Sequence, residues 1–305
     1  MNRQTSRRLS AVAPDDASAE SGRTDTGLTA RELGRVLMAA TAAARSAGRL
    51  MYRNLREPKR VNEATQHDIK LELDVRCQQL LERALRRTLP RAAILGEEGS
   101  TGDVESPLRW VVDPIDGTVN FAHGIPHACV CIALQQRATG TPTPTPPGPV
   151  DPDGFATVLG VVHDPFTDEL WTATDRGPAL LNGRPIRVSE RPRLAEAIVS
   201  LGFGKRGRSL NHMLAALRQL THRVRKLRIT GSAGLAMTYV ASGRFDAFVE
   251  SGVRLWDIAA GGLIVQRAGG VFWRRAIDRQ RSFEIVVSSA PLQRPLHRLA
   301  GSRVS

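Results

Sequence analysis

The sequence has 305 residues, 41% of them hydrophobic, which is enough apolar material to bury the core of one large domain or of two lobes. Its formal charge of +13 predicts a surface that attracts anions, such as nucleic acid, acidic lipid or a phosphorylated metabolite, but the sign alone does not choose among them. Three cysteines are too few for a disulfide framework, so the composition excludes a small disulfide-stapled secreted domain and indicates a reducing compartment.

The N-terminal residues do not fit a targeting signal. Residues 1–26 are rich in Arg, Ser, Asp and Ala and lack the apolar run of a secretory signal, so we predict a disordered tail. Residues 27–305 are expected to fold as one domain of two closely packed lobes. No stretch of about 18 uncharged apolar residues predicts a membrane span. We therefore expect a cytoplasmic protein with no membrane partner.

Two helices open the folded part. A capping box that begins at Thr29 starts an amphipathic helix, which should end before Pro58. A second helix is predicted over residues 74–88, with Asp74 at its start. A short strand at residues 92–95 follows and leads into the acidic pair Glu97-Glu98.

The middle of the chain predicts strands joined by a long insertion. Residues 109–112 and 127–134 have the character of buried strands. The stretch 138–154 is mostly Thr, Pro, Gly and Asp and cannot form a ladder, so it is expected to be an exposed loop. Because residues 157–162 resume an apolar strand at once, a hairpin insertion within one sheet is favoured over a domain linker.

Two of the cysteines share one face of a predicted strand. Cys129 and Cys131 are two positions apart, where side chains point the same way but an ordinary disulfide is geometrically disfavoured. We interpret both as small core residues.

The remaining elements mix strands and helices. Strands are expected at 170–174, 198–203, 226–229, 245–249 and 283–287, and helices at 210–220, 232–241 and 257–266. Because they do not alternate regularly, a layered mixed α/β (α+β) architecture is favoured over a barrel.

Carboxylates recur at the carboxyl ends of the predicted strands. Glu97 and Glu98 follow one strand, Asp113 and Asp116 follow another, and Asp257 comes directly after an apolar stretch. Such crowding is unfavourable unless a cation neutralises it, and hard oxygen donors without histidine or thiolate favour magnesium. For the Asp-Pro-x-Asp-Gly stretch alone, a tight surface turn remains the alternative interpretation.

The residues between and after the two aspartates fit the same interpretation. Pro114 fixes the turn, so Asp113 and Asp116 can approach neighbouring cations while the carbonyl of Ile115 points into the same space. Gly117 permits close backbone approach to a ligand, and the amides of Gly117 and Thr118 can donate to a phosphate.

Three motifs in order resemble the inositol monophosphatase family of magnesium-dependent, lithium-sensitive phosphatases. They are GEE at 96–98, WVVDPIDGTVNF at 110–121 and LWDIAAGGLIVQRAGG at 255–270. The resemblance runs from about Thr29 to the C-terminus. It implies a five-layer αβαβα sandwich of the inositol monophosphatase and fructose-1,6-bisphosphatase type, a homodimer, and two or three Mg²⁺ ions per site.

The resemblance also assigns roles to individual residues. The implied metal ligands are Glu97, Asp113, the Ile115 carbonyl, Asp116 and Asp257. Glu97 is expected to help orient the attacking water, and Thr118, paired with Asp74, is expected to activate it. The implied substrate contacts are Gly117, Thr118, Gly231, Ser232, Ala233, Glu250 and Asp257.

Two departures from the family pattern affect these assignments. The family usually has a threonine in a Val-Thr-x-x-Asp run before the residue that matches Asp74, whereas this chain reads HDIKLELD over residues 67–74. This difference puts a third, weakly held metal in doubt. Arg267 replaces a family glutamate, which removes an acid but no expected ligand.

A basic segment leaves two classes of partner open. Between Ala197 and Phe245 there are nine Lys and Arg residues and no Asp or Glu. The segment is either a solvated face, a surface that steers a phosphorylated substrate, or an RNA-binding surface, although scarce aromatic residues disfavour RNA stacking.

The expected substrate is a small phosphorylated polyol, with inositol monophosphate first and Glu250 accepting hydrogen bonds from its hydroxyls. Histidinol phosphate, fructose 1,6-bisphosphate and adenosine 3',5'-bisphosphate are alternatives of the same chemistry. An alternative of another class is an RNA- or protein-binding regulatory module.

Overall fold

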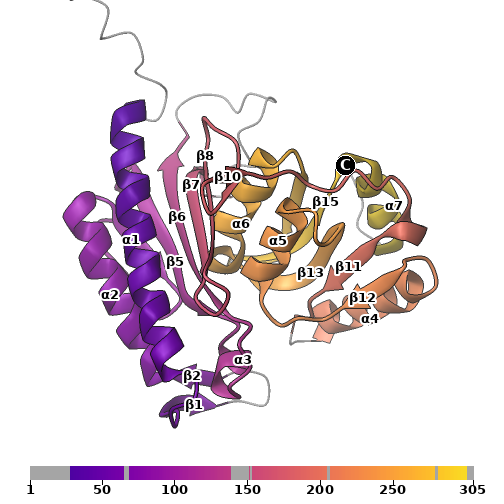
Figure 1. Ribbon diagram of the computed structural model, residues 1–305, viewed down its shortest axis with the longest axis horizontal. Helices are drawn as coiled ribbons and strands as arrows, with labels where there is room; N and C mark the ends of the chain where they lie inside the picture. The colour runs from indigo at the N-terminus through magenta and orange to yellow at the C-terminus, as the bar shows by residue number, and fades with distance from the viewer. Residues whose placement is uncertain are drawn as a thin grey trace, which may run out of the picture.

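The computed structural model stacks its elements in five layers, in the order helix, sheet, helix, sheet, helix (Figure 1). It describes residues 28–64, 69–138, 151, 153–204, 207–278 and 281–300. The predicted tail at 1–26 and most of the predicted loop at 138–154 lie outside this described part. The mixed α+β class and the αβαβα sandwich are confirmed.

Two long helices form the first layer. α1 (Ala30–Asn54) begins at the predicted capping box, in which the Glu32 N–H donates to the Thr29 hydroxyl at 3.2 Å. α2 (Glu72–Thr88) begins two residues before the predicted start, so Asp74 lies inside its first turn. Both helices bury their apolar faces against the first sheet, and small alanines on α1 permit close packing.

The first sheet has eight strands in the order β10-β9-β8-β7-β6-β5-β3-β4, with all described neighbours antiparallel apart from β3 and β5. The central strands are buried on both faces because helices cover both sides. The antiparallel pairing of β6 with β7 confirms the predicted hairpin. The strands are β3 (Ala93–Gly96), β4 (Gly99–Thr101), β5 (Leu108–Asp116), β6 (Cys129–Arg137), β7 (Phe155–Asp164), β8 (Glu169–Thr174), β9 (Leu180–Leu181) and β10 (Arg184–Pro185).

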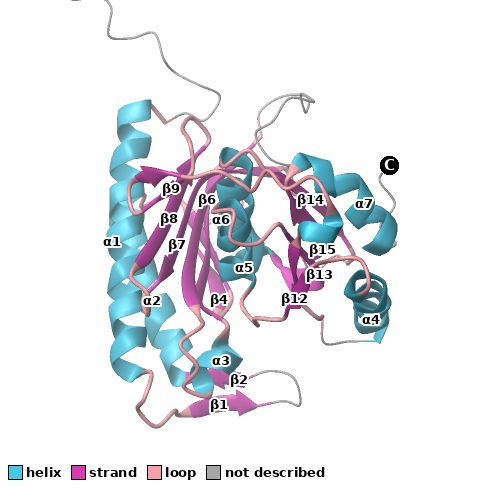
Figure 2. Cartoon of the chain, turned by 45° about the vertical axis from the view of Figure 1, so that its right-hand side comes forward, coloured by secondary structure: helices cyan, strands magenta, loops and turns pink. Residues whose placement is uncertain are grey.

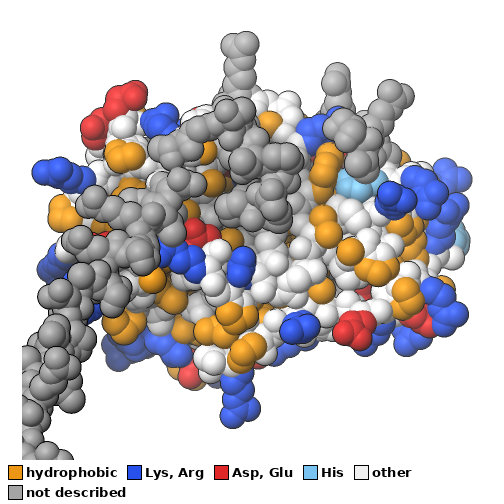
Figure 3. All heavy atoms as spheres, turned by 90° about the horizontal axis from the view of Figure 1, so that it is seen from above, with side chains coloured by type: hydrophobic (Ala, Val, Ile, Leu, Met, Phe, Trp, Pro, Cys, Tyr) orange, Lys and Arg blue, Asp and Glu red, His pale blue; other side chains and the backbone are white. Residues whose placement is uncertain are grey.

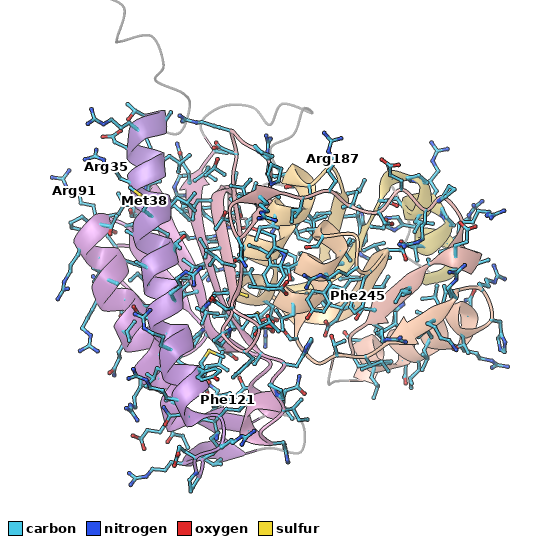
Figure 4. All side chains as sticks on the ribbon, viewed as in Figure 1. Arg35, Met38, Arg91, Phe121, Arg187 and Phe245 are labelled. Atoms are coloured by element: carbon cyan, nitrogen blue, oxygen red, sulfur yellow. The ribbon has the colours of Figure 1, made fainter. Side chains whose placement is uncertain are left out.

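A small ribbon closes one end of this sheet. β1 (Val61–Ala64) pairs with β2 (Ile69–Leu71), and the short helix α3 (Thr118–Ala122) lies beside them (Figure 2). Phe121 of α3 points from this end toward α1 (Figure 4), and its side chain is fully buried. α3 follows β5 directly, so this end carries the acidic motif.

The second sheet has five strands in the order β12-β11-β13-β15-β14. They are β11 (Ile198–Leu201), which follows the 3₁₀ turn Leu194–Glu196, β12 (Lys226–Arg228), β13 (Ala247–Arg254), β14 (Val271–Ala276) and β15 (Ser282–Ser288). α5 (Ala233–Ala241) and α6 (Leu255–Arg267) lie between the two sheets, while α4 (Gly207–Thr221) and α7 (Ala290–Ala300) cover the outer face (Figures 1 and 2). β14 and α7 were not predicted.

Three clusters of buried apolar side chains fill the spaces between the five layers. α5 and α6 are apolar on nearly all sides because they are sandwiched between sheets. All three cysteines are buried and free, and Cys129 and Cys131 are core residues, as predicted. Within the described residues, no helix has the length and apolar character needed to cross a bilayer.

Candidate active site

A β-bulge brings the two aspartates of the acidic motif onto one face of the first sheet. Asp113 pairs with Cys131 and Asp116 pairs with Cys129, so β5 uses three residue steps where β6 uses two. In a regular strand, residues three apart point to opposite faces. The extra residue turns Asp116 back to the face of the sheet that carries Asp113. Both carboxylates are therefore directed toward the central helical layer.

The turn between these aspartates holds one oxygen of the first. The Ile115 N–H donates to Asp113 Oδ1 at 3.0 Å, and Pro114 has no N–H to compete for it. Asp113 is only 2% exposed, so this local bond orients a carboxylate that has little contact with water.

Two more carboxylates occupy the first turns of helices. Asp257 Oδ2 accepts the Arg254 N–H at 2.8 Å at the start of α6, and Asp74 Oδ2 accepts the Leu71 N–H at 2.7 Å at the start of α2. The helix N-terminus stabilises negative charge at both positions. One oxygen of each carboxylate is thus bound to backbone, which fixes the direction of the other.

Asp116 lies at the N-terminus of α5, which is far away in sequence. Its carboxylate accepts the Gly234 N–H at 2.8 Å, the Ala233 N–H at 3.3 Å and the hydroxyl of Ser232. Burial raises the pKa of Asp116, while the Ser232 hydroxyl and the Gly234 amide oppose that shift. Ser232 and Ala233, predicted as substrate contacts, therefore position a carboxylate in this structure.

These groups converge in one cluster. One carboxylate oxygen from each of Asp113, Asp116 and Asp257 lies within 4.8 Å of the others. Burial, followed by Asp257 and Asp74, raises the pKa of Glu97 well above its ordinary value. Burial and then Glu97 do the same for Asp113, and burial and then Asp116 raise the pKa of Asp257 to about 7. The structure brings these five acids into one interacting cluster.

The donor set fits a hard divalent cation. Carboxylates that raise one another's pKa values by burial and repulsion are stabilised as anions when a cation occupies the space among them. The predicted ligands are all oxygens, which favours Mg²⁺. The assignment of Glu97, Asp113, Ile115, Asp116 and Asp257 as its ligands, with two or three ions per site, stays a prediction.

Gln78 fixes the segment that carries Glu97, and the sequence analysis missed it. Its Oε1 accepts the Glu98 N–H at 2.9 Å, and its Nε2 donates to the Gly99 carbonyl at 3.1 Å. Gln78 lies one helical turn after Asp74, so α2 orients both the Asp74 carboxylate and the segment that carries Glu97. The available signal was a polar side chain four residues after an acid on an otherwise apolar face.

The first turn of α3 packs against the segment before α5. Gly117 has φ +90°, and a Cβ there would lie 3.0 Å from the His127 carbonyl oxygen and 3.3 Å from that of Gly231. Asn120 Nδ2 bridges the His127 and Thr230 carbonyls at 2.9 and 2.8 Å. Gly117 and Gly231, both predicted as substrate contacts, are therefore adjacent. Asn120, which was not predicted, fixes the segments around them through its two hydrogen bonds.

Two predicted residues have contacts that their assigned roles do not explain. The Thr118 hydroxyl donates to the Ile115 carbonyl at 2.8 Å, and its predicted pairing with Asp74 stays a prediction. Glu250 lies on β13 with its carboxylate against Gly202, where a Cβ would approach Oε2 to 2.0 Å. Its contact with a substrate hydroxyl also stays a prediction.

Sequence comparison supports the same family as the motifs. The model of the inositol monophosphatase family matches residues 32–143 and 153–297. The chain is 39% identical over 244 residues to the Nus factor SuhB of Pseudomonas aeruginosa, which covers 77% of this chain and 84% of that protein. It is also 39% identical over 202 residues to an inositol-1-monophosphatase of Rhizobium meliloti, with 65% and 69% covered.

Structural comparison agrees. The extragenic suppressor protein suhB from Bartonella henselae superposes with a TM-score of 0.76 at 30% identity, covering 88% of this chain and 100% of that one. The inositol monophosphatase from Anabaena (Nostoc) sp. PCC 7120 gives 0.73 at 28% identity, covering 89% and 97%. The chain therefore belongs to the inositol monophosphatase family, whose members are phosphatases that hydrolyse phosphomonoesters.

Proposed function

We propose that this chain is a Mg²⁺-dependent phosphomonoesterase that acts on a small phosphorylated polyol, with inositol monophosphate as its substrate. The observation that carries the proposal is the convergence of the carboxylates of β5 and α6, which interact with Glu97 after β3 and with Asp74 of α2 in one cluster of acids. The first turn of α3 adjoins this point, because Asp116 directly precedes Gly117. The inositol-1-monophosphatase name of relatives at 39% and 36% identity supports the substrate class.

Each group has a defined part in this proposal. Bound Mg²⁺ would lower the pKa of a water molecule and offset the charge that develops on the phosphoryl and leaving oxygens. Glu97 accepts a hydrogen bond from the attacking water and so orients it. Thr118 turns its hydroxyl from the Ile115 carbonyl toward Asp74 and accepts the water's proton as its own passes to that carboxylate. The amides at 117 and 118 donate to the phosphoryl oxygens.

Substrate hydroxyls are assigned to the other side of the site. Glu250 accepts hydrogen bonds from vicinal hydroxyls, and the backbone around Gly231 limits the size of the bound ring. Lithium inhibition, a homodimer and a cytoplasmic location are part of the same proposal, since they are expectations for the family.

A phosphate-release assay tests the proposal. Inositol 1-phosphate would be compared with histidinol phosphate, fructose 1,6-bisphosphate and adenosine 3',5'-bisphosphate, with Mg²⁺, with added lithium and after chelation by EDTA. We expect the highest kcat/KM for the inositol ester, dependence on Mg²⁺ and inhibition by lithium. A preference for another ester would replace inositol monophosphate as the proposed substrate. If none of these esters is hydrolysed in a Mg²⁺-dependent way, the enzyme proposal is refuted.

A second candidate function is RNA binding. Basic side chains gather at the end of the molecule that carries the second sheet (Figure 3). At and beside its edge strand β12, Arg223, Arg225, Lys226 and Arg228 are exposed. The relatives named Nus factor SuhB also support this second candidate. RNA affinity that falls steeply with salt, and falls further in Arg225→Ala and Arg228→Ala, would support it, whereas unchanged affinity in both variants would exclude this surface.

A further inference from the structure

Behind the carboxylate cluster lies a second group of potential ligands of different chemistry. Cys129 and Cys131 point from β6 into the central layer, and their sulfur atoms lie 3.7 Å apart. Cys129 Sγ lies 3.4 Å from Asp116 Oδ2, and one oxygen of Asp116 together with both sulfurs fits within 4.8 Å. Asp116 is thus shared between an all-oxygen group and a sulfur-rich one.

The spacing matches a tetrahedral thiophilic cation. Two sulfurs bound to one zinc at about 2.3 Å lie about 3.8 Å apart, and a carboxylate oxygen bound at about 2.1 Å lies about 3.6 Å from each of them. The observed 3.7 Å between the sulfurs and 3.4 Å from Cys129 to Asp116 are within a few tenths of an ångström of these values. The hydroxyl of Ser232, 3.8 Å from Cys129 Sγ, is placed as a fourth neighbour.

A glycine gives this group its space. A Cβ on Gly234 would lie 2.6 Å from Cys131 Sγ, 3.0 Å from Cys129 Sγ and 2.9 Å from Asp116 Oδ2. The three ligand atoms therefore converge on the bare face of Gly234, where any side chain would collide with all of them. Both thiols are almost fully buried.

We infer that Cys129, Cys131 and Asp116 form a second metal site, selective for thiophilic divalent cations such as Zn²⁺ or Cd²⁺, whose occupation withdraws Asp116 from the oxygen site. Each sulfur loses its proton to solvent as its bond to the cation forms, so two S–H bonds give way to two sulfur–metal bonds and two protons are released. Mg²⁺ does not compete for the sulfurs because it prefers oxygen. Only the resulting inhibition of hydrolysis rests on the proposed function.

The test is a Cd²⁺ titration of the full-length, metal-free protein in a non-thiol reductant with excess Mg²⁺. We expect an ultraviolet thiolate-to-cadmium charge-transfer band that saturates at one ion per chain. Cys129→Ser and Cys131→Ser should each weaken binding by about tenfold or more, since each removes one of three ligands. Cys77→Ser, which alters the third buried cysteine on α2, should leave the band unchanged.

The outcomes separate this inference from the enzyme proposal. Absence of the band in the wild-type protein, or full retention of it in the single serine variants, overturns the second site whatever the activity is. If the protein is a phosphatase, Cys131→Ser should raise the Zn²⁺ concentration for half-inhibition by about tenfold, and Cys77→Ser should not. Equal inhibition in both would mean that zinc acts at the carboxylates alone, which overturns the inhibitory role.

Discussion

Asp113 and Asp164 occupy the same local structure, near the carboxyl end of one strand and at the carboxyl end of another in the same sheet. Each is followed by proline, and each accepts the N–H of the residue two positions later, at 3.0 Å for Asp113 and 2.8 Å for Asp164. Both are buried. They differ in surroundings, because Asp113 faces Glu97 and Asp116, whereas Asp164 is outside the carboxylate cluster found among the described residues.

This pair isolates the role of charge in the site. Asp113→Asn should lower kcat/KM with Mg²⁺ by at least about a hundredfold, because it removes a proposed ligand while keeping the local hydrogen bond. Asp164→Asn makes the same chemical change in the same turn and should keep activity within about threefold. Steady-state kinetics and circular dichroism measure both. A fully active Asp113→Asn protein would contradict the proposed metal centre.

Gln78 should control metal affinity without contacting the metal. Gln78→Ala frees the segment that carries Glu97 from α2, so the Mg²⁺ concentration for half-maximal activity should rise by about tenfold or more. Gln79→Ala, at the exposed neighbouring position, serves as the control and should leave this Mg²⁺ concentration unchanged. If the two variants behave alike, the bonds from Gln78 do not orient the site.

Gly117 and Gly124 form a second matched pair. Both have positive φ, so alanine at either position costs about 1 kcal/mol of strain. A Cβ on Gly124 meets only the Leu55 carbonyl at 3.8 Å, whereas one on Gly117 meets backbone at 3.0 Å. Urea denaturation should show a larger loss for Gly117→Ala, and the phosphatase assay should show loss of activity for it alone. Equal effects would contradict the close packing of α3 on the segment before α5.

Asp151 links the two sheets through buried charge. It accepts from Arg109 of β5 at 3.1 Å and pairs with Arg274 of β14 at 2.5 Å, and all three side chains are almost fully buried. Asp151→Asn leaves two arginines without full compensation and should lower the free energy of unfolding by about 3 kcal/mol. Asp153→Asn, at a partly exposed partner of Arg109, should lower it by about 1 kcal/mol or less. Similar losses of unfolding free energy in the two variants would contradict a link between the sheets through Asp151.

Short local patterns were sufficient for much of the fold. The capping box at Thr29 and the apolar runs of β6 and β7 predicted elements at the right places because each is a local signal of burial or capping. β14 was missed because Arg274 occupies an inward position, which the distant Asp151 makes favourable through a buried ion pair. α7 was missed because Pro295 lies inside it, where the sequence rule ends a helix.

The candidate site was also predictable only in part. The acids were visible as residues, and the motif order indicated that they belong together. The bulge between Asp113 and Asp116 was not predictable, because register depends on the partner strand. That the Asp116 carboxylate accepts the amides at the start of α5 depends on the packing of two layers, and no spacing in the sequence encodes it.

The position of Asp116 at the start of α5 makes ion binding and interlayer cohesion thermodynamically linked. Any cation that alters the bonds between this carboxylate and the Ser232 and Gly234 donors changes how firmly a helix of the middle layer is anchored to the first sheet. By reciprocity, a substitution that loosens that anchorage alters affinity for the cation by an equal free energy. Metal titrations of variants remote from the carboxylates therefore report on the cohesion of the whole sandwich.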